Sequence, residues 1–82
     1  MPTYQELMQY VRERKTKASR SRMLNSDLKF AKDTFKDLQE AISQRGGMLH
    51  GAIHTKKDLS KYALYIHHLE TLILLNKEGV LG

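Results

Sequence analysis

LKFAKDTFKDLQEAI, residues 28–42, is the stretch that decides the fold of this 82-residue chain. Its apolar residues recur at spacings of three and four, the heptad pattern of a helix that packs along one seam. The seam residues are Leu28, Ala31, Phe35, Leu38 and Ile42. A second stretch, LSKYALYIHHLETLI at residues 59–73, repeats this spacing with Leu59, Tyr62, Ile66, Leu69 and Ile73. Two matching seams joined by a short connector predict an antiparallel helical hairpin.

The first of these helices is expected over residues 26–45. Asn25 or Ser26 is the expected N-cap, because short polar side chains satisfy the free N–H groups of a first helical turn. Gly46 and Gly47 follow the last apolar residue and stop the helix, one of them as the left-handed residue after the C-cap.

The second helix of the hairpin is expected over residues 55–76. Thr55 and Asp58 have the spacing of a capping box at its start. Between the two helices, the connector Met48–His54 is compatible with an irregular loop, a turn of helix or a stub of strand, and contains Gly51.

A shorter helix is expected at the start of the chain, over residues 3–14. Thr3 and Glu6 again match a capping box, and four apolar residues follow at helical spacing. These are Tyr4, Leu7, Met8 and Val11. Beyond Arg14 the apolar pattern ends, so the following residues are expected to form a frayed helical extension or a linker.

Taken together, these patterns predict an all-α fold: one small three-helix domain over residues 1–82, built on an antiparallel helical hairpin with heptad-like seams. The residues in the middle of the seams pack from both directions and are the expected core. They are Phe35, Leu38, Ile66 and Leu69.

The net charge of +5 is concentrated in the segment 12–22. This segment holds six bases and a single acid, Glu13, whereas the rest of the chain holds eight bases and eight acids. Several cations within a Debye length, about 8–10 Å, reinforce one another and attract anions. The candidate polyanion-binding residues are therefore Arg12, Arg14, Lys15, Lys17, Arg20 and Arg22.

Nucleic acid, DNA or RNA, is the favoured partner of this segment, because lysine and arginine that neutralise phosphates release counterions. Thr16, Ser19 and Ser21 add hydroxyl donors suited to backbone contact. No aromatic residue is interleaved with the cations, so stacking on single-stranded bases is not indicated. The alternatives are docking on an acidic protein surface and simple solvation.

No pattern of catalysis is present, and we expect a protein that is not an enzyme and needs no cofactor. The chain has no cysteine, no glycine-rich phosphate loop and no serine beside an evident base. Of the four histidines, His67 and His68 are adjacent and would point about 100° apart on a helix. Gly51 interrupts the face that His50 and His54 would share, so no metal site is predicted.

The helix at 55–76 carries more apolar residues than one seam needs. Leu64, Tyr65, Leu72 and Leu75 lie outside the seam. Either they form the interface of a homodimer, or this helix is central and is covered by both of the others.

The longest apolar run, Leu72–Leu75, is too short to cross a bilayer, and the first residues do not have the pattern of a signal peptide. No contact with a membrane is therefore expected. Together with the absence of cysteine, this favours the cytoplasm.

The sequence thus predicts a regulatory or interaction module whose segment 12–22 engages nucleic acid. The first alternative is an inhibitor or adaptor that docks this segment and the apolar face of helix 55–76 on an acidic partner protein. A structural subunit of an assembly is the third possibility.

Overall fold

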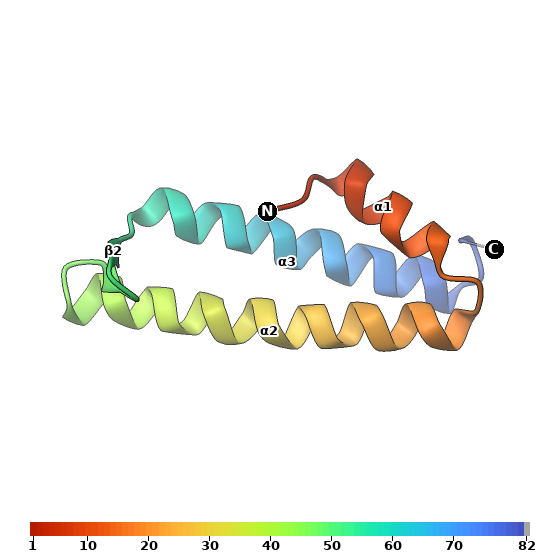
Figure 1. Ribbon diagram of the computed structural model, residues 1–82, viewed down its shortest axis with the longest axis horizontal. Coiled ribbons are helices and arrows are strands. Elements are labelled where there is room, and N and C mark those ends of the chain that lie inside the picture. Colours follow the sequence, from red (N-terminus) through yellow and green to blue (C-terminus); the bar gives the residue numbers. More distant parts are fainter. Residues whose placement is uncertain (82) are drawn as a thin grey trace.

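The computed structural model describes residues 1–81 and confirms the all-α fold. Three helices, α1 (Tyr4–Glu13), α2 (Lys17–Gln44) and α3 (Lys56–Lys77), account for most of the chain (Figure 1). Two short strands, β1 (Met48–Leu49) and β2 (Ala52–Ile53), connect α2 to α3. The helices α2 and α3 run antiparallel side by side, so the molecule is a rod of 44 × 19 × 19 Å.

The predicted caps of α1 and α3 are confirmed. Thr3 accepts a hydrogen bond from the Glu6 N–H at 3.2 Å, and the Thr3 N–H donates to the Glu6 carboxylate at 3.4 Å. At the start of α3, the Asp58 carboxylate accepts from the Thr55 N–H at 3.1 Å. Both helices thus begin within a residue of the expected position.

α2 begins nine residues earlier than predicted, at Lys17, and the expected caps Asn25 and Ser26 lie inside it. Its N-cap is Thr16, whose hydroxyl accepts from the Ser19 N–H at 3.1 Å. Leu24 is fully buried four residues before the first predicted seam residue, so the seam continues toward the start of the helix. This burial outweighs the low helix propensity of the serines and asparagine in the segment.

The connector Met48–His54 contains a β-hairpin, one of the three conformations left open by the sequence. Its antiparallel pairs are Met48 with Ile53 and Leu49 with Ala52. The two turn residues, His50 and Gly51, have φ of 51° and 77°. Positive φ at both central residues is typical of the tight type I′ turn.

Gly47 is required where α2 meets this β-hairpin. Its N–H donates to the Ala41 carbonyl at 2.8 Å, and its φ is 92°. A Cβ atom at this position would collide with the His54 carbonyl oxygen. Gly46, which follows the C-cap Arg45, has the predicted left-handed φ of 61°, and at Gly47 the close packing adds a second reason for glycine.

The core lies mainly in the half of the rod where all three helices meet. The residues of this cluster are Leu7, Val11, Leu24, Ala31, Leu69 and Leu72. Of the predicted core residues, Leu38 and Leu69 are fully buried, Ile66 packs against the cluster, and Phe35 is half-buried. The predicted position in the core is therefore confirmed fully for Leu38 and Leu69, and only in part for Ile66 and Phe35.

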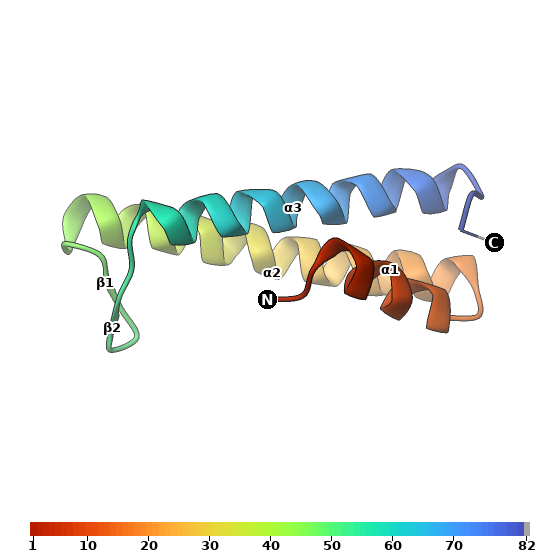
Figure 2. The same cartoon turned by 90° about the horizontal axis from the view of Figure 1, so that it is seen from above.

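α1 covers only one half of the α2–α3 helical hairpin. In Figure 2, α1 and the β-hairpin lie on the same side of α2 and α3, but at opposite ends of the rod. Because α1 has ten residues against 28 in α2, the other half of this side has no helix over it.

Candidate nucleic-acid interface

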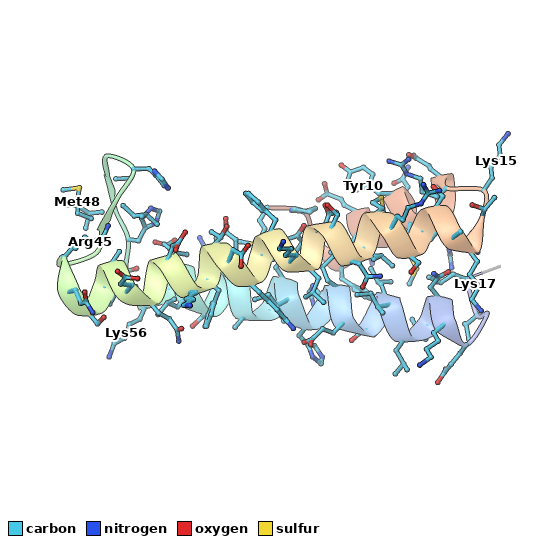
Figure 3. The ribbon with its side chains drawn as sticks, turned by 90° about the horizontal axis from the view of Figure 1, so that it is seen from below. Tyr10, Lys15, Lys17, Arg45, Met48 and Lys56 are labelled. Atoms are coloured by element: carbon cyan, nitrogen blue, oxygen red, sulfur yellow. The ribbon has the colours of Figure 1, made fainter. Side chains whose placement is uncertain are left out.

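Five of the six predicted polyanion-binding residues are exposed at one end of the rod. They are Arg12, Arg14, Lys15, Lys17 and Arg22, and we call this set the basic end. It spans the last turn of α1, a three-residue loop and the first turns of α2. Figure 3 shows Lys15 and Lys17 at one tip of the molecule and Lys56 at the other.

Arg20, the sixth predicted residue, is buried and belongs to the fold. Its side chain is 5% exposed. Nε donates to the Asn76 side-chain oxygen at 2.9 Å, and a terminal nitrogen donates to the Arg14 carbonyl at 2.9 Å. The Asn76 amide in turn donates to the Lys17 carbonyl at 3.2 Å. The expectation that Arg20 contacts a polyanion is therefore corrected: its charge is directed inward.

This buried network fixes the loop that carries the basic end. Arg20 and Asn76 together bind the carbonyls of Arg14 and Lys17, one on each side of the loop. A buried polar group that is fully hydrogen-bonded restricts the backbone around it. The exposed cations therefore project from a backbone that is held in place from within.

Lys17 is held partly by the end of α3. Its ammonium donates to the Lys77 carbonyl at 3.0 Å, where the free carbonyls of a helix carry partial negative charge. Lys17 is nevertheless exposed, so its charge still contributes to the field around the basic end.

Two acids, Glu13 and Asp27, line the cavities beside the basic end, but among the described residues they form no ion pair with its cations. Within residues 1–81, none of the five forms an ion pair with aspartate or glutamate. Among the eight bases outside segment 12–22, two form ion pairs: Lys32 lies 3.9 Å from Glu70, and Arg45 lies 3.3 Å from Glu40. The concentration of charge seen in the sequence thus persists in space.

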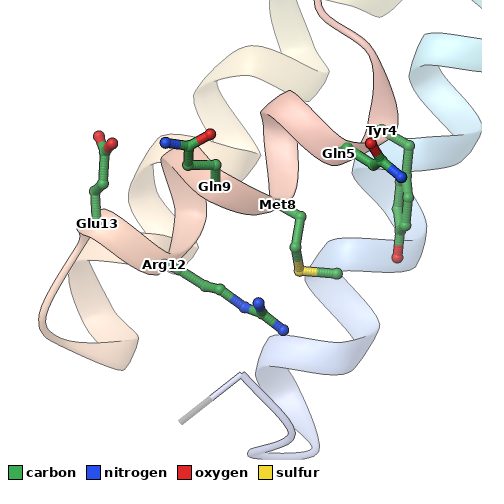
Figure 4. Close-up of a pocket in the computed structure, with 6 residues that line it drawn as sticks. All are labelled: Tyr4, Gln5, Met8, Gln9, Arg12 and Glu13. Carbon is green, nitrogen blue, oxygen red and sulfur yellow. The ribbon is translucent and has the colours of Figure 1, made fainter.

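Two shallow cavities border the basic end. One, of about 470 Å³, lies between the loop and α2, and its lining includes Arg14 and Arg22 with the hydroxyls of Ser19 and Ser26. The other, of about 640 Å³, runs along α1 (Figure 4). In it Arg12 extends beside the thioether of Met8 toward α3.

The apolar residues outside the α3 seam do not form one exposed face. Leu72 is fully buried, and Tyr65 and Leu75 pack against the core cluster. Only Leu64, at 56% exposure, is open to solvent. The expected dimer interface on these four residues is therefore corrected: α1 covers this side of α3, as the central-helix alternative required.

The histidines are spread over two regions. His54 lies 3.2 Å from Asp58, whose pKa is lowered mainly by the Thr55 N–H and further by His54. The ring of His68 packs on Tyr4 with centroids 5.0 Å apart. Among the 81 described residues, no three histidine, aspartate or glutamate side chains lie where they would share a metal ion.

Asn76 is the residue of this region that sequence reasoning missed. It is the last residue of the expected helix 55–76 and lies seven residues after Leu69, on the buried side of α3. A polar residue in register with a heptad seam indicates a buried hydrogen bond, and that was the available signal.

Comparisons with known protein families, with curated proteins and with solved structures find no match for this chain. None of the helices within residues 1–81 is long and apolar enough to cross a membrane.

Proposed function

We propose that this protein is a non-enzymatic helical module that binds the phosphate backbone of nucleic acid through its basic end. The observation that carries the proposal is the exposure of five cations at one tip of the rod without acidic partners among the described residues. When exposed lysine and arginine side chains neutralise phosphates, the counterions condensed on the nucleic acid are released. This release favours binding without any base-specific geometry.

The arrangement of the basic end suits contact with a backbone rather than with bases. Its charges come from two helix ends and a loop, so they form a compact cluster instead of a recognition helix for a groove. The hydroxyls of Ser19 and Ser26 beside Arg22 add neutral donors for phosphate oxygens. The network around Arg20 supports the proposal because cations on a fixed backbone lose less entropy on binding.

A second candidate is an inhibitor or adaptor that docks on an acidic protein. It is favoured by the cavity along α1, in which Tyr4 and Met8 provide apolar surface next to Arg12 (Figure 4). An acidic segment of a partner would pair a carboxylate with Arg12 and pack an apolar side chain on Tyr4 and Met8. Leu64 is the part of the predicted α3 face that remains accessible for such a partner.

We also propose that the protein acts in the cytoplasm as a homodimer. The absence of cysteine supports a reducing compartment. Two copies would present two basic ends, and linked binding sites raise the overall affinity for a long polyanion.

The deciding experiment is a titration of labelled duplex DNA, duplex RNA and single strands with the full chain at several salt concentrations. For a duplex, the logarithm of the affinity is expected to fall linearly with the logarithm of salt, by about 0.9 per phosphate contacted. A pull-down with and without nuclease separates the candidates. A stoichiometric protein retained after nuclease favours the acidic partner, and binding insensitive to salt excludes both candidates.

A further inference from the structure

A third open cavity borders the basic end, between the first turns of α2 and the last turns of α3. Its volume is about 580 Å³, and it is lined by Lys17 of α2 and Lys77 of α3. We call it the α2–α3 cavity. Each of the two cavities described above includes an acid in its lining, Asp27 in one and Glu13 in the other. In contrast, none of the described residues that line the α2–α3 cavity is acidic.

Lys77 is a cation that the fold adds to this end of the rod. It lies 60 residues after Lys17 in the sequence and outside the segment 12–22, yet Nζ of Lys17 donates to the Lys77 carbonyl at 3.0 Å. Both lysines are exposed, and within residues 1–81 neither forms an ion pair with a carboxylate. Glu78, the residue after Lys77, does not line the cavity. Two ammonium groups thus reach one cavity from two different helices.

The helix ends beside the α2–α3 cavity leave this positive charge in place. The start of α2 carries about half a positive charge and the end of α3 about half a negative charge, so their fields oppose each other. Lys17 binds a carbonyl at the end of α3. Because an ammonium group has three donors, two of them remain for an anion. The two lysines therefore dominate the charge of the cavity.

The same cavity contains neutral hydrogen-bond donors on α2. The Asn25 side-chain amide donates to the Ser21 hydroxyl oxygen at 3.2 Å, and both residues line the cavity. Since Ser21 is the acceptor of this bond, its own hydroxyl hydrogen can be donated to a ligand. Serine hydroxyls and asparagine amides are common donors to phosphate oxygens. The polar part of the lining therefore suits a phosphate group.

Asn76 gives the α2–α3 cavity a fixed base. It is 3% exposed, accepts from Arg20 at 2.9 Å and donates to the Lys17 carbonyl at 3.2 Å. A cavity whose base is held in this way loses less entropy when a ligand binds. Ala18 and Ile73 add apolar surface to the lining. Cationic walls with an apolar area between the helices suit a phosphate that is attached to a sugar, since proteins contact both parts of a nucleic-acid backbone.

We propose that the α2–α3 cavity binds a phosphate of the nucleic-acid backbone and that Lys77 is a further cation of the interface. This inference rests on the proposed function and gives it a contact outside the segment 12–22. Arg14 and Arg22 line the neighbouring cavity. Because Ser21 and Arg22 are consecutive, the two cavities lie about 100° apart around α2. The backbone of the nucleic acid therefore crosses the start of α2 and contacts it on both of these sides.

Fluorescence anisotropy of a labelled duplex with the full chain, measured against salt, tests the role of Lys77. Lys77→Gln should reduce the steepness of the salt dependence by about one, because one phosphate contact is lost. Lys77→Arg keeps the charge and should keep the steepness. Lys56→Gln is the matched control, because Lys56 is an exposed lysine of α3 at the opposite tip (Figure 3). Circular dichroism confirms that each variant is folded. Equal salt dependence of Lys77→Gln and Lys56→Gln would overturn the proposal.

The side-chain amide of Asn25 gives a second readout, which does not require nucleic acid. Inorganic phosphate, exchanged for chloride at constant ionic strength, should shift the nuclear magnetic resonance signal of this amide in the isotope-labelled chain. The side-chain amide of Gln44, exposed at the far end of α2, is the control and should not shift. Lys77→Gln should reduce the shift at Asn25. If neither inorganic phosphate nor a duplex moves the Asn25 signal, the α2–α3 cavity does not bind phosphate.

The inference and the proposed function fail in different ways. If Lys15→Gln lowers the salt dependence of duplex binding and Lys77→Gln does not, the basic end binds nucleic acid and this inference is wrong. If no duplex binds at any salt concentration while inorganic phosphate still shifts the Asn25 amide, the proposed function is wrong. The α2–α3 cavity then binds phosphate from a source other than nucleic acid.

Discussion

Nε of Arg20 lies 2.9 Å from the side-chain oxygen of Asn76, joining the first turns of α2 to the last turn of α3 inside the protein. Arg20, one of the six cations of segment 12–22, thus stabilises the part of the fold that carries the other five. Arg20 and Asn76 also bind the backbone carbonyls on both sides of the α1–α2 loop. The conformation of the basic end therefore depends on a residue that does not face solvent.

Loss of this contact is expected to destabilise the fold. Asn76→Ala removes the acceptor of a buried, charged donor, so the free energy of unfolding should fall by about 1–3 kcal/mol. Asn25→Ala is the control, because Asn25 makes only an exposed hydrogen bond to Ser21. Urea denaturation followed by circular dichroism measures both. Equal stability of the two variants would mean that the Arg20–Asn76 contact contributes nothing.

Arg20 and Arg22 are expected to respond oppositely to truncation. Arg22→Ala should leave stability nearly unchanged and, if Arg22 contacts a phosphate, lower the salt dependence of duplex binding by about one. Arg20→Ala should instead reduce stability. Fluorescence anisotropy against salt, together with thermal denaturation, separates the two effects. If Arg22→Ala binds duplexes like the unaltered chain at every salt concentration, Arg22 is not part of the interface.

Truncation in the seams should reveal where packing is complete. Leu69→Ala and Leu38→Ala are each expected to cost about 2–5 kcal/mol, because both side chains are fully buried. Leu64→Ala on the solvent side of α3 should change stability by no more than about 0.5 kcal/mol. Chemical denaturation checks all three. A large effect at Leu64 and a small one at Leu69 would show that α3 is rotated from the orientation described here.

Stability should fall in acid partly through Asp58. Its hydrogen bond from the Thr55 N–H lowers the pKa of the carboxyl below its ordinary value of 3.8. A carboxyl whose pKa is lowered on folding stabilises the protein above its unfolded pKa, and this contribution disappears as pH falls through the lowered folded pKa. Asp58→Ala should therefore be less stable than the unaltered chain at pH 7, with the difference shrinking below about pH 4. Thermal denaturation at a series of pH values gives the comparison, and a difference that does not depend on pH would contradict it.

Much of the fold was predictable because the capping residues and the spacing of the apolar residues indicated the same helices. The caps at Thr3 and Thr55 and the stop at Gly46 and Gly47 came from backbone requirements that any helix end imposes. The start of α2 was wrong because Ser26 has the features of a cap, whereas the true cap, Thr16, stands among residues of low propensity. Burial of Leu24 against α1 and α3 decided between the two sites.

The sequence showed which segment holds the excess positive charge, but it did not show which of its cations face solvent. In the sequence, Arg20 and Arg22 are equivalent members of one basic run, and nothing local separates them. A helix turns by about 100° per residue, so two positions apart they point to different sides of α2, one toward Asn76 and one toward solvent.

By itself, then, the sequence determined the three helices, their antiparallel hairpin and the segment that holds the net charge, because periodicity and composition act locally. Only the tertiary structure decided that α1 lies across Leu72 and leaves Leu64 exposed, and that Phe30 remains uncovered on α2. The physical reason is that apolar side chains on a helix are chemically alike, and the position of a neighbouring helix alone decides which of them lose their contact with water.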